Sequence, residues 1–164
     1  MDAFQLTLLA ATLLCALVAG FLVSFAVVVM PGLRALSPAD YLRAFQAMDG
    51  VIQRGHPLFA LMWLGSVLAL VAAAALGWSR LEGLERGLLL AAAGVYLLGV
   101  QLPTFLFNIP LNNRLQALDV AGMEPAAQEA LRAEFEGRWI RSNTARTILA
   151  CLVSGALLVV VLGV

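Results

Sequence analysis

Charged residues are scarce in this sequence of 164 residues, because only 12% are Asp, Glu, Lys or Arg whereas 62% are hydrophobic. A chain with so few charges could not keep a globular surface wetted in water, which excludes a soluble globular domain. The ten basic and ten acidic residues balance, and we expect no nucleic-acid partner. The expected partner is the lipid bilayer itself.

Charge is entirely missing from four long stretches, residues 3–33, 55–79, 87–113 and 147–164. Each is near or above the ~20 residues with which an α-helix crosses a ~30 Å hydrocarbon core. Strands are excluded because the runs are too long and do not alternate. The predicted fold is an all-α integral membrane four-helix bundle with amphipathic interfacial helices in its two long links. It forms a single domain, residues 1–164, with spans near 6–30, 57–78, 87–107 and 145–163.

Cysteine and histidine are also rare. Cys15 and Cys151 lie in apolar segments without CxxC or Cys/His spacing, and His56 is the only histidine. This pattern gives no recognised metal or haem ligand set, so we expect no metal and no cofactor. The start of the chain, "MDAF", carries an acid and lacks the basic residues of a secretory signal, so we expect the first apolar run to remain in the mature protein.

The arginines are distributed unequally between the two sides of the predicted bundle. The links 31–56 and 108–146 hold eight arginines, whereas the side with both termini holds only Arg80 and Arg86. The positive-inside rule then places the long links in the cytoplasm and both termini outside. The localisation that we expect is the inner (plasma) membrane of a bacterium. No span carries a charge at mid-depth, which argues against a channel or transporter.

The first long link predicts a helix over residues 37–54, with Ser37 as N-cap and Pro38 at the first helical position. Helical spacing places one apolar stripe next to a polar stripe that contains Gln46, Asp49 and Gln53. Two interpretations remain open. The polar stripe is either the wet flank of a helix lying on the membrane, or it directs Asp49 toward a cavity between the spans.

The segment "NIPLNNRL", residues 108–115, crowds three asparagines, a proline and an arginine at the end of an apolar run. Pro110 disfavours helix at Ile109, so we expect the third span to loosen near Asn108. Asn108 and Asn112 then either cap this broken end or line a pocket.

The second link predicts another helix from Pro125, running toward "WIRSNTART", residues 139–147. Trp139, Asn143 and Arg146 share one helix face. Interfacial anchoring explains Trp and Arg but leaves the asparagine unexplained. The predicted topology gathers these residues, "NIPLNNRL", Asp49, His56 and residues 30–33 at one membrane face. We therefore predict one polar pocket there, roofed by the interfacial helices.

Three segments together resemble a known membrane family that includes the fungal anthrone oxygenases. They are "GFLVSFAVVVMPGLRALSPADYLRAFQAMDGVIQ" (20–53), "FNIPLNNRL" (107–115) and the spaced Trp, Asn and Arg at 139, 143 and 146. The resemblance implies a four-helix membrane fold. It also implies, for some members, oxygenation of a hydroxyaromatic anthrone to an anthraquinone without an obvious metal or flavin. Fold alone does not determine the reaction.

If the oxygenase hypothesis holds, an anthrone supplies an acidic carbon whose carbanion reacts with dioxygen, so the protein needs a base, charge-stabilising donors and exclusion of water. The candidate bases are Asp49 and His56, although a lone histidine at the start of a span is more often an interfacial residue. The candidate substrate-binding residues are Asn108, Asn112, Asn143, Arg146, Trp139 and Gln53. The alternative is a non-catalytic membrane protein that binds a quinone-like or lipid ligand, or a partner protein, with the same groups.

Overall fold

The computed structural model describes residues 1–163, and every regular element in this range is a helix. Four helices in this range are long and apolar enough to cross a membrane, Ala3–Leu33, Pro57–Gly77, Gly83–Gln116 and Pro125–Gly163. The first and third contain short π-helical segments. The elements are α1 (Ala3–Ser24), a π-helical segment (Phe25–Val29), α2 (Met30–Leu33), α3 (Pro38–Gln53), α4 (Pro57–Gly77), α5 (Gly83–Val95), π-helical segments (Tyr96–Gln101 and Thr104–Asn108), α6 (Ile109–Gln116), a 3₁₀ turn (Val120–Gly122) and α7 (Pro125–Gly163).

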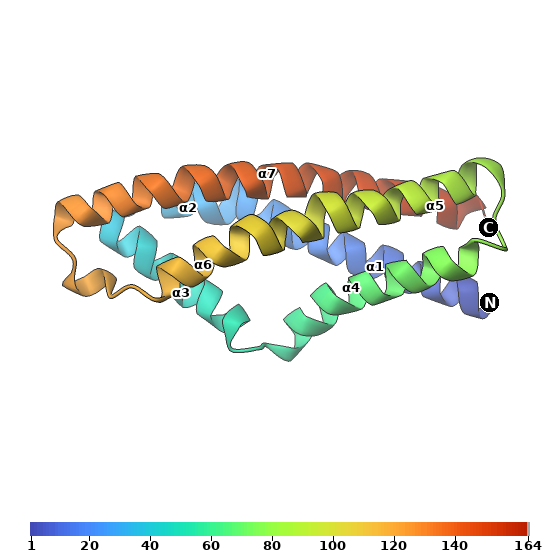
Figure 1. Cartoon of the computed structure of the whole chain (residues 1–164), viewed down its shortest axis with the longest axis horizontal. Helices are drawn as coiled ribbons and strands as arrows, with labels where there is room; N and C mark the ends of the chain where they lie inside the picture. Colours follow the sequence, from blue (N-terminus) through green and yellow to red (C-terminus); the bar gives the residue numbers. More distant parts are fainter. Residues whose placement is uncertain (164) are drawn as a thin grey trace.

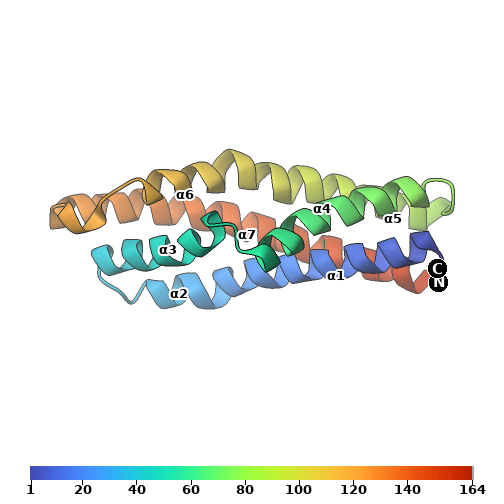
Figure 2. The same cartoon turned by 90° about the horizontal axis from the view of Figure 1, so that it is seen from below.

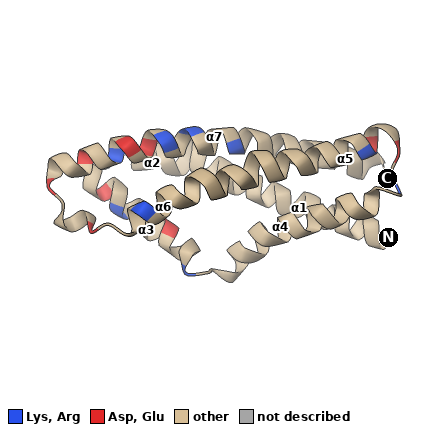
Figure 3. Cartoon of the chain, in the orientation of Figure 1, with Lys and Arg blue, Asp and Glu red and all other residues tan. Residues whose placement is uncertain are grey.

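The helices form an elongated bundle with both chain ends at one end and the two long links at the other (Figures 1 and 2). Helix α1 packs between α4 and α7, and α5 packs on α7. Charged residues gather at the link end and continue along α7 toward the middle of the bundle, and a few lie near the chain ends (Figure 3). The predicted all-α membrane bundle is thus confirmed.

The outer surface of the bundle is apolar. On α4, Leu58, Leu61, Leu64 and Leu68 are all more than half exposed and follow one another at helical spacing. A continuous exposed leucine stripe of this kind would be unfavourable in water but suits contact with lipid chains. The surface therefore agrees with the membrane environment inferred from composition.

The link segments build a second core at their end of the bundle. Its buried members are Met30, Tyr41, Leu42, Phe45, Leu115, Val120, Phe135 and Trp139. Helix α3 packs against α6 and α7 and runs along the bundle (Figure 2). The helix predicted over 37–54 is present, with the Ser37 hydroxyl accepting from the Asp40 N–H. Within its polar stripe Asp49 does not face solvent, because it is only 5% exposed, whereas Gln53 at the end of the helix is exposed.

The second link helix and the last span are one continuous helix, rather than an interfacial helix followed by a separate span. Helix α7 has 39 residues, which at 1.5 Å per residue is about 58 Å, or nearly twice the hydrocarbon thickness. Nothing between Pro125 and Gly163 interrupts it, and the two glycines inside it, Gly137 and Gly155, remain helical. This length lets one rigid element carry residues of both cores.

Each of the three π-helical segments ends two residues before a proline, Pro31, Pro103 or Pro110. The residue just before each proline donates its N–H five residues back, as Ile109 does to the Thr104 carbonyl. A proline lacks an N–H and its ring crowds the preceding turn, and a widened turn relieves that crowding without breaking the helix. The helix does loosen near Asn108, as a widened π-helical segment over Thr104–Asn108, but the expected break at Ile109 was wrong, since Ile109 keeps helical φ and ψ of −60° and −48°.

Candidate functional site

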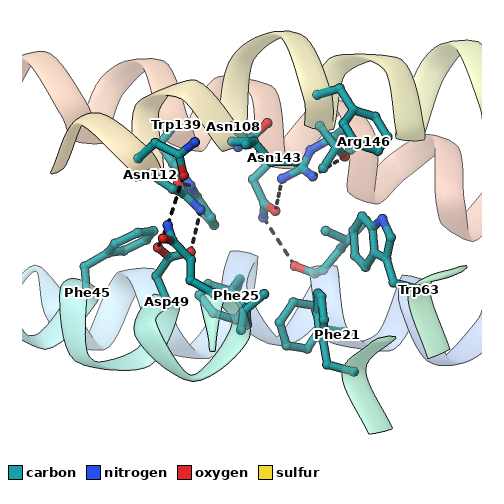
Figure 4. A pocket seen from close by; sticks show the side chains of 18 residues that line it. Phe21, Phe25, Phe45, Asp49, Trp63, Asn108, Asn112, Trp139, Asn143 and Arg146 are labelled. Atoms are coloured by element: carbon teal, nitrogen blue, oxygen red, sulfur yellow. Dashed lines mark hydrogen bonds between the residues drawn. The ribbon is translucent and has the colours of Figure 1, made fainter. Parts of the chain in front are cut away.

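A cavity of about 290 Å³ lies where the two cores meet, and side chains from all four long helices and α3 converge on it (Figure 4). It is lined by Phe21, Leu22, Phe25, Phe45, Asp49, Ile52, Gln53, Phe59, Trp63, Thr104, Phe105, Asn108, Ile109, Asn112, Asn113, Trp139, Asn143 and Arg146. Its volume is at the lower end of the range for small-molecule sites. The tight turn at Gly55, which has a φ of 77°, brings the end of α3 beside the start of α4 on one side of the cavity.

The carboxylate of Asp49 forms the acceptor end of the cavity. Its Oδ1 accepts from Asn112 Nδ2 at 2.7 Å, and its Oδ2 accepts from Gln53 Nε2 at 2.8 Å and from Gln116 Nε2 at 3.0 Å. A carboxylate offers about four acceptor positions. Three amide donors therefore fix this buried side chain and leave Oδ1 with room for one more donor.

Trp139 determines which way the amide of Asn112 faces. The indole Nε1–H donates to Asn112 Oδ1 at 3.0 Å, so the amide nitrogen is turned toward Asp49. An indole N–H can only donate. The chain of hydrogen bonds from Trp139 through Asn112 to Asp49 consequently has one direction and couples α7, α6 and α3.

The opposite end of the cavity presents hydrogen-bond donors around Arg146 (Figure 4). Arg146 is 3% exposed; its Nη1 donates to Thr104 Oγ1 at 2.7 Å and its Nη2 to Asn143 Oδ1 at 3.1 Å. Asn143 is itself held by its Nδ2 donating to the Leu22 carbonyl. Among residues 1–163, neither Arg146 nor Asp49 takes part in an ion pair. A buried charge without a counterion is costly, which marks this arginine as a functional candidate.

Two donors at this end have no partner within the described chain, Arg146 Nε and Asn108 Nδ2. The Asn108 side chain is oriented by Ser142, whose hydroxyl donates to Asn108 Oδ1 at 2.6 Å. Both side chains are almost fully buried and both line the cavity. Buried donors are normally paired, so these two groups are available to a ligand oxygen.

Aromatic rings form the walls between the two ends. Neighbouring rings along the series Trp63, Phe59, Phe21, Phe25, Trp139 and Phe45 have centroids 5.0 to 5.6 Å apart. Each of the six lines the cavity. Flat apolar walls with polar groups only at the ends favour a planar aromatic ligand.

Most of the residues predicted for the site line this cavity. Asp49, Gln53, Asn108, Asn112, Trp139, Asn143 and Arg146 all do. His56 does not: it is exposed and lies in a neighbouring groove that shares Phe21, Phe25, Ile52 and Phe59 with the cavity lining. Residues 30–33 and Arg114 also lie outside the cavity lining. Met30 is instead buried in the second core. Of the two candidate bases, only Asp49 therefore lines the cavity.

Other lining residues were not anticipated from the sequence. Phe21 with Phe25, and Phe59 with Trp63, are pairs at four-residue spacing near the link ends of their helices; that spacing was the available signal. Gln116 donates to Asp49 from the last turn of α6. Among residues 1–163, no group of three His, Cys, Asp or Glu side chains is placed to hold a metal ion.

A comparison with protein families gives one match. The family described as anthrone oxygenase matches residues 48–157, which is more than half of the chain and includes Asp49, the "FNIPLNNRL" segment and the residues at 139, 143 and 146. The earlier part of the first resembling segment, residues 20–47, lies outside the match. No curated protein and no solved structure matches the chain. The chain belongs to the anthrone oxygenase family.

Proposed function

We propose that the protein is a cofactor-independent oxygenase that converts a hydroxyanthrone-type substrate to the corresponding quinone in this cavity. The observation that carries the proposal is that one end of the cavity accepts hydrogen bonds and the other end donates them. One end offers a fixed carboxylate and the other a buried guanidinium and amide, with aromatic walls between them. Family membership supports the same class of reaction.

The arrangement matches an anthrone because its reactive methylene and its carbonyl lie on opposite sides of the central ring. With the methylene near Asp49 Oδ1, the carbonyl oxygen points toward Arg146 Nε and Asn108 Nδ2. Removal of a methylene proton moves negative charge onto that oxygen. Donors already in place stabilise the charge as it develops, which is the usual source of the largest rate effect in such sites.

The remaining steps balance with dioxygen as the only oxidant. The carbanion transfers electrons to dioxygen and forms a carbon–oxygen bond, and the peroxide takes up the first proton. Loss of the second proton from the same carbon breaks the oxygen–oxygen bond and gives the carbonyl of the quinone. The released hydroxide and that proton form water. One dioxygen is consumed per anthrone, with one oxygen atom in each product.

Dioxygen uptake by the purified protein with a dihydroxyanthrone tests the proposal, after subtraction of the spontaneous rate without protein. We expect Asp49→Asn to lower the protein-dependent rate by about 10²-fold or more, as for loss of a general base. Asp119→Asn is the matched control, since Asp119 is exposed at the same end of the bundle and outside the cavity lining. Isotopically labelled dioxygen should place one labelled atom in the quinone. Equal rates in wild type and Asp49→Asn would remove Asp49 as base.

A second candidate function is non-catalytic binding of a quinone-like molecule. It is favoured by the three amide donors that already occupy Asp49, because such a carboxylate serves as a hydrogen-bond acceptor for a ligand hydroxyl. Quenching of tryptophan fluorescence by a hydroxyanthraquinone would measure binding. Saturable binding without protein-dependent dioxygen uptake would favour this function over the oxygenase.

A further inference from the structure

A second hollow lies on the outer surface of the bundle and shares no lining residue with the aromatic cavity. It has a volume of about 430 Å³ and lies between α7 and the end of the third long helix. Its lining is Leu106, Phe107, Pro110, Leu111, Arg114, Arg138, Arg141 and Ser142. We refer to these residues as the arginine groove.

The two halves of the arginine groove differ in chemistry. Leu106 and Phe107 are 57% and 54% exposed and belong to the uncharged stretch 87–113. The three arginines lie beyond that stretch, toward the link end where charges gather (Figure 3). The groove therefore crosses the level at which apolar surface gives way to charged surface, which is the level of lipid headgroups in a bilayer.

The groove keeps a net positive charge after its ion pairs are counted. Glu134 pairs with Arg114 at 2.6 Å and with Arg138 at 3.6 Å. Arg141 is exposed and forms no ion pair with any residue in 1–163. One carboxylate against three guanidinium groups leaves two positive charges facing the solvent side of the groove.

We propose that the arginine groove binds one anionic phospholipid, with the headgroup phosphate on the guanidinium groups and an acyl chain along Leu106 and Phe107. The planar guanidinium donates two parallel N–H groups to phosphate oxygens, a geometry that an ammonium does not offer. The net charge favours an anionic headgroup over a zwitterionic one. The apolar half distinguishes a lipid from free phosphate, which would use the arginines alone. This site is independent of the proposed oxygenation.

Native mass spectrometry of the protein in detergent micelles tests the site, with phosphatidylglycerol, phosphatidylcholine and inorganic phosphate as separate probes. We expect saturable retention of one phosphatidylglycerol. Arg141→Glu should weaken it by about 25-fold, because it changes the local charge by two and each charge near an anionic lipid contributes about fivefold. Arg43→Glu is the matched control, since Arg43 is exposed at the same end of the bundle and outside the groove, and should change retention less than twofold.

The apolar half is tested separately with Leu106→Asn, which should weaken retention of phosphatidylglycerol. Thermal unfolding of each variant shows whether it is folded, and Arg141→Gln serves if Arg141→Glu unfolds. Equal effects of Arg141→Glu and Arg43→Glu would overturn the proposal, because binding would then reflect surface charge in general. Equal retention of phosphatidylcholine, or full competition by inorganic phosphate with no effect of Leu106→Asn, would also overturn it.

Discussion

Substitution of Asp49 by asparagine should create a hydrogen-bond conflict that spreads to Trp139. The new amide keeps one acceptor, and its best position accepts from Gln53 and Gln116, as Oδ2 does now. Its NH₂ group then faces the NH₂ of Asn112. Rotation of the Asn112 amide would remove that conflict but would turn its NH₂ toward the Trp139 indole N–H, which now donates to Asn112 Oδ1. Either orientation of the Asn112 amide leaves two donors facing each other without an acceptor between them.

The size of the effect follows from the one additional unpaired donor that is present when residue 139 is tryptophan. One buried donor without a partner costs about 1–3 kcal/mol. Trp139→Phe removes the indole N–H, so in that background Asn112 is free to rotate and accept from the new amide, and only the Asn112 NH₂ group is left without an acceptor. Asp49→Asn should therefore destabilise the wild-type protein by about 1–3 kcal/mol more than it destabilises the Trp139→Phe variant.

A double-mutant cycle measured by thermal or denaturant unfolding in detergent micelles gives this coupling directly. The lost volume of Trp139→Phe is common to both sides of the cycle and cancels. Asp119→Asn with Trp139→Phe is the control cycle and should be additive within about 0.5 kcal/mol, as for distant sites. Additive effects of Asp49→Asn and Trp139→Phe would refute the directed chain from Trp139 through Asn112 to Asp49.

Three further predictions concern the site and the topology. Arg146→Lys keeps the charge, but one nitrogen cannot replace the fork that contacts Thr104 and Asn143, so oxygenation should fall by about 10- to 100-fold in a dioxygen-uptake assay. His56→Ala should change the rate of dioxygen uptake by less than about twofold, because the histidine is exposed and outside the cavity lining. A large loss of that rate would show that His56 takes part in the reaction. A cysteine placed at Ala126 should react with a membrane-impermeant reagent only in opened cells, and labelling of intact cells would reverse the orientation expected from the arginines.

The membrane fold was predictable from the sequence because charge-free runs of sufficient length leave helices as the only structure that satisfies the backbone in lipid. Helical spacing also placed Trp139, Asn143 and Arg146 on one face, and all three line the cavity. Spacing within a helix is a local property. It is retained whatever the helix packs against.

Relations between helices were harder to predict. The link helices looked amphipathic, and that pattern does not distinguish a membrane surface from a second core such as the one around Tyr41 and Phe45. His56 lies at the same end of the bundle as Asp49, but it follows the turn between α3 and α4 and is exposed, whereas Asp49 precedes that turn and lines the cavity. Which of the two residues lines the cavity depends on how α3 and α4 pack. The effect of Pro110 was misjudged because a π-helical turn absorbs the missing N–H without ending the helix.

The most direct test of the central claim is an experimental structure of the protein with a bound hydroxyanthraquinone, the product of the proposed reaction. The ligand should lie between the aromatic walls, with one oxygen within hydrogen-bond distance of Asp49 Oδ1 and another near Arg146 Nε and Asn108 Nδ2. A ligand bound at another place on the molecule, with Arg146 and Asn108 satisfied by protein groups alone, would contradict the account.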